Sequence, residues 1–169
     1  WSSDVCSSDL QGLLVKLFLL RHGDADAGFP DGSRKLSAYG RQQVISVASE
    51  HAAQCKDVQM ILTSPLQRAS ETADLFTTYG LTQCRRQTVD YLLPTTSVKT
   101  VELNLQAVAY SCLLMVGHLP MLENLINYFT GDSGARMETA SIASLSMEFP
   151  MQGLDRKRTR LNSSHLVIS

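Results

Sequence analysis

The sequence has no apolar run long enough to cross a bilayer, because its longest such stretch, residues 13–20, is short and contains Lys16. It also lacks an excess of charge of either sign, since 15 Lys and Arg residues balance 16 Asp and Glu residues. Nucleic-acid-binding proteins usually carry a strong basic excess or a basic stripe. We therefore expect a soluble, cytoplasmic protein that has neither a nucleic-acid partner nor a membrane partner.

The sequence is equally short of residues in metal-ligand or nucleotide-binding patterns. Its four cysteines form neither a CxxC pair nor a Cys/His cluster with the spacing of metal ligands, and they are Cys6, Cys55, Cys84 and Cys112. The P-loop pattern GxxxxGK[ST] is absent, which argues against nucleotide binding of that kind. One loop contains three acidic residues that we interpret as turn-forming and solvating, namely Asp24, Asp26 and Asp31. No metal and no cofactor are expected.

The two ends of the chain differ from its centre. Residues 1–12 and 151–169 show no hydrophobic periodicity, and the first residue is Trp1 rather than methionine. A basic cluster at 156–160 fits a solvated or non-native tail better than a nucleic-acid or membrane site. We therefore expect residues 1–12 and 151–169 to be non-native or disordered tails, and residues 13–150 to form one functional domain.

Within this domain, strand-like apolar runs alternate with segments of helical spacing. Strands are predicted at 13–20, 58–63, 112–116 and 144–149, with a weaker extended piece at 87–89. Helices are predicted over about 37–51, 64–79, 97–106 and 120–131. This order predicts an α/β three-layer sandwich around a mostly parallel sheet, with 144–149 as an edge strand.

Serine, proline and glycine residues indicate where these helices begin and end. Ser37 is expected to cap the first helix, while Ser64 and Pro65 resemble an N-cap followed by proline at the first helical position. Gly80 and Gly131 are expected to end the second and fourth helices.

Polar residues that can bind a ligand or take part in catalysis follow three of the predicted strands. Arg21 and His22 come after the first strand, Ser64 and then Arg68 after the second, and His118 after the strand at 112–116. Taken singly, each has an ordinary explanation as a loop or surface residue. Ligands of open α/β sheets bind outside the carboxyl ends of the strands, so the joint occurrence predicts a site.

The residue types indicate an anionic ligand. Arg68 lies in the first turn of a predicted helix, where the helix dipole is positive and a bound anion would relieve the conflict. The planar fork of arginine matches phosphate oxygens, and neutral imidazole can act as a nucleophile towards phosphorus. These residues therefore favour a site for a dianionic phosphoryl group, where arginines would stabilise the charge on its oxygens.

Four segments resemble motifs of the histidine phosphatase superfamily. They read LRHG at 20–23, LSAYG at 36–40, SPLQRASETA at 64–73 and VGHLP at 116–120. RHG alone is a weak signal, but its combination with SPxxRAxxT and a later GH after a strand is specific. The short chain, together with SIAS at 141–144, is most similar to bacterial phosphohistidine phosphatases. The resemblance implies a phosphoglycerate-mutase-like fold in a short form without large insertions.

The resemblance also implies a role for each matching residue. His22 would be the phosphorylated nucleophile, while Arg21, Arg68 and His118 would hold and polarise the phosphoryl group. Ser64 is interpreted as a helix cap that could also touch the phosphate. Arg34, together with the adjacent Lys35, corresponds to a basic position near the pocket mouth of relatives, although a solvated loop is the safer interpretation. Gly23 would allow close backbone approach or simply support a turn.

One departure from the superfamily bears on the substrate. Relatives that hydrolyse phosphate esters commonly have a glutamate as general acid after the second helix, where this sequence reads VDYLLP at 89–94. Asp90 is the only carboxylate nearby, and either Asp90 or Tyr91 occupies the corresponding position. An alkoxide leaving group needs a proton, whereas the imidazole released from phosphohistidine has a pKa of about 6.5 and can take its proton from solvent. The departure favours phosphohistidine.

The expected substrate is therefore a phosphohistidine-bearing phosphotransfer protein, which a shallow and open site would admit, and the enzyme is expected to be a monomer. The main alternative is a small-molecule phosphomonoesterase that uses Asp90 or a loop aspartate as acid. A non-catalytic phosphate-binding module is a second alternative, although inactive relatives tend to lose one of the four matching Arg and His residues. A mutase is least favoured, because its pocket must retain and reorient the substrate.

Overall fold

A central sheet organises the chain. The computed structural model describes residues 13–81, 84–131, 133–149 and 167–168, which form a sheet of order β3-β2-β4-β1-β5-β6. Its strands are β1 Leu13–Arg21, β2 Met60–Thr63, β3 Arg85–Thr88, β4 Cys112–Gly117, β5 Ile142–Phe149 and β6 Val167–Ile168. Strands β1 to β4 run parallel to one another, whereas β5 is antiparallel to β1 and β6.

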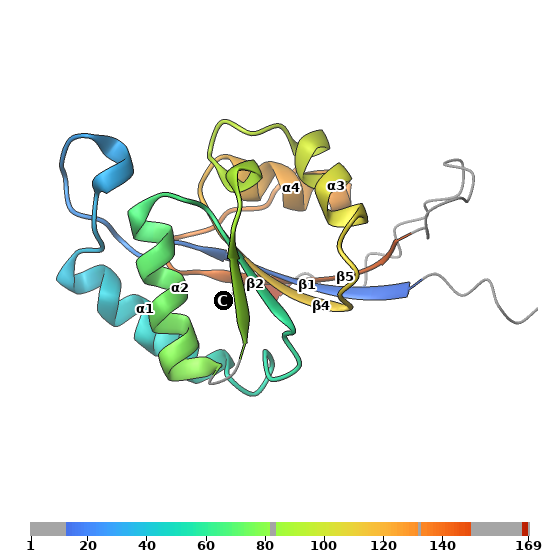
Figure 1. Cartoon of the computed structure of the whole chain (residues 1–169), viewed down its shortest axis with the longest axis horizontal. Coiled ribbons are helices and arrows are strands. Elements are labelled where there is room, and N and C mark those ends of the chain that lie inside the picture. The colour runs from blue at the N-terminus through green and yellow to red at the C-terminus, as the bar shows by residue number, and fades with distance from the viewer. Residues whose placement is uncertain (1–12, 82–83, 132, 150–166, 169) are drawn as a thin grey trace, which may run out of the picture.

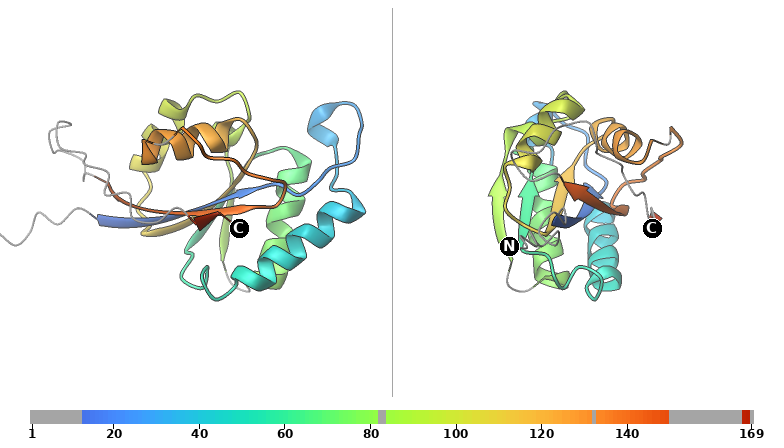
Figure 2. Two further views of the ribbon diagram at one scale, coloured as in Figure 1. Left: turned by 180° about the vertical axis from the view of Figure 1, so that it is seen from behind. Right: turned by 90° about the vertical axis from the view of Figure 1, so that its right-hand side faces the viewer.

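Helices cover both faces of this sheet. Figure 1 shows α1 and α2 on one face and α3 and α4 on the other, and Figure 2 shows the same three layers from two further sides. The helices are α1 Ala38–His51, α2 Gln67–Gly80, α3 Val98–Gln106 and α4 Met121–Thr130, with short 3-10 turns η1 Asp31–Ser33 and η2 Asp90–Leu92. The predicted α/β sandwich with a mostly parallel sheet and no large insertion is confirmed.

Residues 17–20 of β1 are all apolar because both faces of the strand are buried there. Leu17 and Leu19 pack into the core on the α3 and α4 side, while Phe18 and Leu20 pack into the core on the α1 and α2 side. Each of these side chains is at most 1% exposed. A strand between two helical layers cannot alternate apolar and polar residues, and each buried Leu or Phe stabilises the fold by about 1.5–3 kcal/mol.

Two helix ends agree with the predicted signals at Ser37 and Gly131, and the cap at Ser97 was not predicted. The Ser37 side chain accepts a hydrogen bond from the Gly40 amide at the start of α1, and the Ser97 side chain does the same for Thr100 at the start of α3. Gly131 ends α4 in the left-handed conformation at φ 72°. Such serine caps stabilise a helix by about 1 kcal/mol each.

The structure corrects several predicted boundaries. Helix α2 begins at Gln67 rather than at Pro65, because the chain remains extended through Leu66. Gly80 lies within α2, where a Cβ would come within 2.9 Å of the Ala48 carbonyl oxygen, so this glycine serves the packing of α2 on α1. Strand β2 starts at Met60, because Val58 closes a turn by donating to Cys55.

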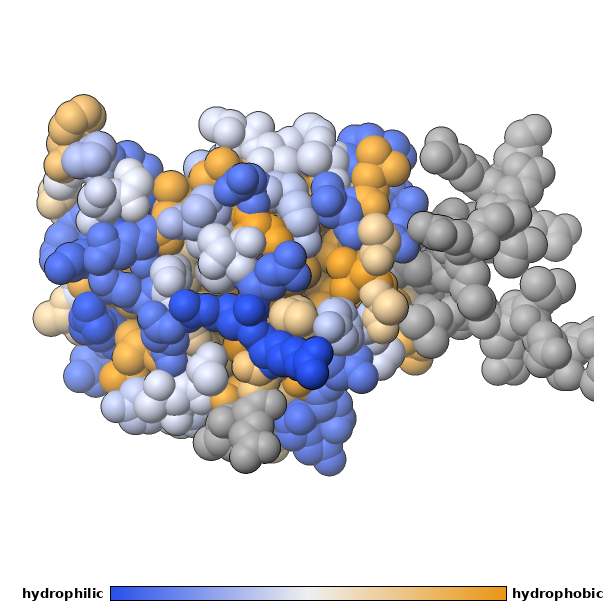
Figure 3. All heavy atoms as spheres, in the orientation of Figure 1, coloured by the Kyte–Doolittle hydropathy of each residue, from blue (hydrophilic) through white to orange (hydrophobic). Residues whose placement is uncertain are grey.

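The predicted edge strand is also corrected. Strand β5 begins at Ile142, and β6 pairs with it at Ala143 and Ser144, so β5 is not the edge of the sheet. The opposite edge is β3, whose four residues are all exposed, and Figure 3 shows a strongly hydrophilic band there. Charged side chains on an edge strand discourage pairing with other chains.

The predicted tails fall mostly outside the described residues, which include only 167–168 of them. Their non-native character therefore stays a prediction. No helix in the described part of the chain combines the length and the apolar character needed to cross a membrane.

Candidate active site

The carboxyl ends of three adjacent strands bring the predicted site residues together. Strands β2, β4 and β1 are neighbours in the sheet, so the residues that follow them meet at one edge. The His22 and His118 ring centroids are 4.9 Å apart. Arg68 Nε lies 3.3 Å from His22 Nε2, and Ser64 Oγ lies 2.8 Å from His118 Nε2. Residues distant in sequence thus form one polar cluster.

The hydrogen bonds of His22 fix the position of its ring proton. His22 Nδ1 lies 2.7 Å from the Gly23 carbonyl oxygen, which can only accept a hydrogen bond, so Nδ1 carries the proton. Nε2 is then unprotonated, and its lone pair accepts a hydrogen bond from Arg68 Nε. Nε2 is therefore the atom that can attack an electrophile, and the backbone holds the ring in this tautomer.

Burial and positive charge keep both imidazoles neutral. Burial lowers the pKa of His22 to about 4, helped by the charges of Arg68, Arg21 and Arg34. Burial likewise lowers the pKa of His118 to about 3, with further contributions from His22 and Arg68. At neutral pH the nucleophilic lone pair is therefore available, and no proton has to be removed first.

This electrostatic environment predicts an unusual histidine titration. The imidazole C–H resonances of His22 and His118 should stay at their neutral positions from pH 8 down to about pH 5, because both pKa values lie below that range. Ordinary histidines change charge near pH 6.5. NMR of the wild type, assigned with His22→Gln and His118→Gln, measures this. A midpoint near 6.5 for either residue would contradict the environment described here.

Arg68 is the more firmly held of the two site arginines. It is only 6% exposed, and it donates from Nη1 to the Asp31 carbonyl oxygen at 2.9 Å and from Nη2 to Asp31 Oδ2 at 3.0 Å. Its place in the first turn of α2 adds the positive end of a helix to the site. Arg68 thus presents a fixed positive charge beside His22.

Arg21 and His118 retain unpaired polar atoms. Arg21 donates from Nη1 to the Met137 carbonyl oxygen at 2.7 Å, but its buried Nε has no hydrogen-bond partner among the described residues. His118 Nδ1 is in the same situation. Buried polar atoms are normally paired, so oxygen-rich ligands suit these two positions.

Thr72 links the loop that follows β1 to Arg68, a contact that was not predicted from the sequence. Its hydroxyl accepts from the Gly23 amide at 3.2 Å and donates to the Arg68 carbonyl oxygen at 2.7 Å. Thr72 follows Arg68 by four residues and so lies on the same face of α2, which was the available sequence signal. The two hydrogen bonds of Thr72 therefore join the loop after β1 to α2.

Gly23 and Gly40 let the loop that follows β1 pack directly on α1. A Cβ on Gly40 would lie 2.0 Å from the Asp24 carbonyl oxygen, and a Cβ on Gly23 would lie 2.6 Å from the Gly40 carbonyl oxygen. Close approach is therefore the role of Gly23, as the first of its two predicted roles required. The role of Gly40 in the same contact was not predicted.

Gly40→Ala should destabilise the protein although alanine normally favours a helix by about 1 kcal/mol. The clash with the Asp24 backbone reverses that gain, and we expect a net loss of about 2 kcal/mol, or roughly 4–8 °C in melting temperature. Gly28→Ala is the control, because its Cβ would meet only Arg34 Cγ at 3.8 Å. Equal melting temperatures for the two variants would argue against the close packing.

Two further interpretations of site residues change. Ser64 is not the cap of α2, because its backbone amide bonds to the Val116 carbonyl oxygen and keeps it in line with β2, fully buried beside His118. Arg34 is more than a solvated residue, since it donates to Asp31 Oδ1 and to the Asp26 and Ala25 carbonyl oxygens. Arg34 therefore braces the loop between β1 and α1.

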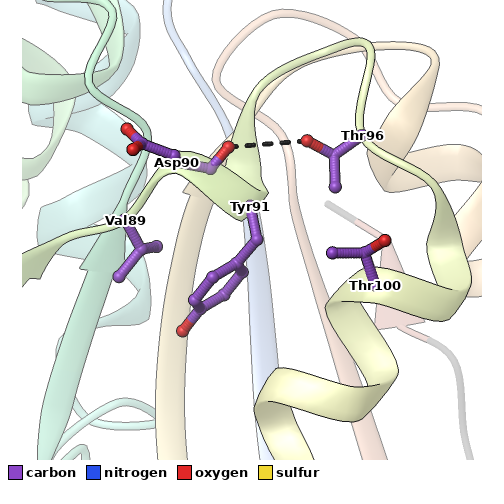
Figure 4. Close-up of a pocket in the computed structure, with 5 residues that line it drawn as sticks. All are labelled: Val89, Asp90, Tyr91, Thr96 and Thr100. Atoms are coloured by element: carbon purple, nitrogen blue, oxygen red, sulfur yellow. Dashed lines mark hydrogen bonds between the residues drawn. The ribbon is translucent and has the colours of Figure 1, made fainter.

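The candidate general acids, Asp90 and Tyr91, line a pocket that follows β3. Val89, Asp90, Tyr91, Thr96 and Thr100 line it, and Figure 4 shows the Asp90 carboxylate turned away from Thr96 and Thr100. Asp90 is exposed, and burial raises the pKa of Tyr91. Among the described residues, neither side chain makes a hydrogen bond to the histidines of the site.

The loop aspartates act as local braces. Asp24 Oδ2 accepts from the Ser37 hydroxyl at 2.6 Å, and Asp31 starts the η1 turn, in agreement with a turn-forming role. Asp31 additionally contacts Arg68, which was not predicted. No group of three or more His, Cys, Asp or Glu side chains in the described ranges is placed to hold a metal ion.

Comparison with known protein families finds one match. The family model "Histidine phosphatase superfamily (branch 1)" matches residues 17–87, which contain Arg21, His22, Ser64 and Arg68. The resemblance to the histidine phosphatase superfamily is confirmed. The match therefore includes four residues of the cluster, whereas His118 lies beyond it.

Individual proteins resemble this chain in the same way. The phosphohistidine phosphatase SixA of Escherichia coli K12 is 26% identical over 140 residues, which are 79% of this chain and 86% of SixA. The structure of the protein histidine phosphatase SixA with tungstate has a TM-score of 0.75 at 25% identity, covering 79% of this chain and 89% of that one. A structure from Agrobacterium tumefaciens that is also named SixA shares the fold with a TM-score of 0.71. The two sequences are 20% identical, and the match covers 79% of this chain and 92% of that one.

Proposed function

We propose that this protein is a phosphohistidine phosphatase that hydrolyses phosphohistidine on a phosphotransfer protein through a phosphorylated His22. The observation that carries the proposal is a neutral imidazole whose unprotonated Nε2 accepts a hydrogen bond from the buried Arg68 guanidinium. This arrangement supports His22 as the nucleophile and Arg68 as the charge stabiliser in phosphoryl transfer.

The reaction proceeds in two displacements. His22 Nε2 attacks the phosphorus, a new N–P bond forms, and the N–P bond to the substrate histidine breaks, its electron pair remaining on that imidazole. The leaving imidazole takes a proton from solvent. Water then attacks the phosphorus on His22, loses a proton to solvent, and releases orthophosphate and neutral His22.

The surrounding residues act mainly through charge. Arg68 and Arg21 stabilise the negative charge on the phosphoryl oxygens during both displacements, as positioned cations do in phosphoryl transfer. His118 and Ser64 form a hydrogen-bonded pair beside them and supply polar atoms to the same group. The tungstate in the related SixA structure, an oxyanion like phosphate, agrees with an oxyanion site of this kind.

The proposed substrate class follows from the leaving group. Asp90 is exposed, and within the described residues the hydrogen bonds of His22 and His118 go to Gly23, Arg68 and Ser64 rather than to a carboxylic acid. Phosphohistidine does not require one, because imidazole is a good leaving group near neutral pH. The name of the E. coli relative, phosphohistidine phosphatase, supports the same substrate.

A substrate panel tests this proposal. We expect kcat/KM for a phosphorylated phosphotransfer domain to exceed kcat/KM for sugar phosphates and p-nitrophenyl phosphate by at least about a hundredfold. Orthophosphate release is followed for all substrates at one pH. Comparable values for esters and phosphohistidine would instead support a phosphomonoesterase, and binding of phosphate without turnover would support a non-catalytic module.

A further inference from the structure

The loop between β1 and α1 brings a carboxylate into the arginine cluster. Asp31 receives two hydrogen bonds from Arg68, one at its carbonyl oxygen and one at Oδ2, and Oδ1 accepts from Arg34 Nη1 at 3.1 Å. The Arg68 guanidinium, followed by that of Arg34, holds the pKa of Asp31 below its usual range. The site residue Arg68 is therefore already paired with an anion of the protein itself.

This pairing competes directly with a phosphoryl group. A guanidinium has five N–H donors, and Arg68 commits three of them, Nε towards His22 and one each from Nη1 and Nη2 to Asp31. Phosphoryl oxygens bonded to the phosphorus that His22 attacks would lie beside the same guanidinium and face the Asp31 carboxylate. Two negative groups beside the same guanidinium repel each other, so phosphate binding weakens the contact between Asp31 and Arg68, and that contact weakens phosphate binding.

Exposure indicates which partner gives way. The Arg68 side chain is 7% exposed and packed at the start of α2, whereas the Asp31 side chain is 62% exposed on a three-residue turn. The preceding Phe29 is 98% exposed, so a large protein that approaches the site can contact this turn before its phosphoryl group reaches His22. A small phosphate has no such additional contact.

We infer that Asp31 determines specificity by occupying Arg68, so that the site favours phosphoryl groups carried on proteins over free phosphate and small phosphorylated molecules. A small anion must displace the carboxylate with its own binding free energy alone. A protein substrate can offset that displacement through contacts with the exposed turn. This inference rests on the proposed function, because it concerns the substrate choice of the same site.

Asp31→Asn tests the inference, with Asp26→Asn as the matched control. Both variants remove one negative charge from the same loop, but the Asp26 side chain makes no hydrogen bond or ion pair within the described residues. Isothermal titration with orthophosphate should show about tenfold tighter binding for Asp31→Asn and less than about twofold change for Asp26→Asn. Asp31→Glu keeps a carboxylate, so its affinity for orthophosphate should be close to the low affinity of the wild type.

Kinetics on two substrates provides a readout that a structural role would not move. For Asp31→Asn, KM for phosphoramidate, a small N–P compound, should fall about tenfold, while kcat/KM for a phosphorylated phosphotransfer domain should rise by a smaller factor, because association of the two proteins limits it. Phosphate binding by Asp31→Asn that is equal to or weaker than wild type would overturn the inference. So would an equal gain in Asp26→Asn, which would reflect overall charge alone.

The same experiment separates this inference from the proposed function. In one outcome the wild type binds phosphate and hydrolyses phosphohistidine, and Asp31→Asn shows the same phosphate affinity and the same kinetics on both substrates. This outcome contradicts only the role of Asp31. Wild type that hydrolyses esters as well as phosphohistidine, with the Asp31→Asn gain in phosphate affinity present, contradicts the proposed function but supports the displacement of Asp31. Absence of phosphate binding in every variant contradicts both.

Discussion

His22→Ala should abolish phosphohistidine hydrolysis, with a loss of about 10⁴-fold or more in kcat. The substitution removes the Nε2 lone pair that Arg68 and the Gly23 carbonyl oxygen position, and no second neutral nucleophile in the described cluster has the same contacts. Removal of a covalent nucleophile is among the largest single effects in enzymes, because the whole two-step route is lost. The measurement is single-turnover release of orthophosphate from a phosphorylated phosphotransfer domain.

A control separates loss of the nucleophile from loss of the fold. His51→Ala removes another buried imidazole, on α1 and outside the site, whose ring contacts Gln54. We expect His51→Ala to lose stability while keeping kcat within a few-fold of wild type. Residual hydrolysis by His22→Ala near the wild-type rate would show that another group, or water, attacks the phosphorus.

Arg68→Lys should lower kcat/KM by about 10²–10³-fold although it preserves the positive charge. Lysine cannot reproduce the planar fork that contacts His22 Nε2 and Asp31 at once, and its ammonium group is shorter in reach. Losses of this size follow removal of one positioned donor from a charge-stabilising site. The effect should fall on kcat at least as strongly as on KM, because the charge contact strengthens as the phosphoryl group is transferred.

Arg85→Lys is the matched control for this substitution. Arg85 is exposed on the edge strand β3, remote from the carboxyl-end cluster, so the same chemical change should leave kcat/KM within about twofold. Steady-state kinetics of both variants at equal ionic strength measures the difference. A loss of less than about threefold in Arg68→Lys would show that Arg68 acts as a diffuse charge only.

Much of the fold follows from short-range sequence signals. The apolar run of β1 is read directly from the sequence because a strand covered on both faces must be apolar throughout. Ser37, Ser97 and Gly131 mark helix ends because each acts on a backbone group only a few residues away. Such signals need no knowledge of the tertiary structure.

The main site residues are also predictable, because their position after strands is a topological property. Once the sheet is mostly parallel, His22, Ser64 and His118 must emerge at the same edge. The sequence does not indicate that Ser64 bonds to His118 rather than capping α2. That choice depends on how far the chain stays extended after β2, which a serine followed by proline leaves open.

The contacts made by loops and glycines are least predictable. The Asp31–Arg68 pair joins residues 37 positions apart through a loop with no periodicity, and Asp31 has an equally good local explanation as a turn residue. Gly40 lies within a helix, where a glycine carries no signal of its own. Its role emerges only when the loop that follows β1 is packed against α1.

Transfer of phosphate from substrate to enzyme tests the central claim most directly. A phosphotransfer domain carrying ³²P-phosphohistidine is mixed with excess enzyme, quenched in alkali within milliseconds, and digested for peptide mapping. If His22 is the nucleophile, acid-labile and alkali-stable label appears on the peptide that contains His22, and no label appears on the His22→Ala variant. Orthophosphate release at the wild-type rate with no label on the enzyme, or label on another residue, would contradict it.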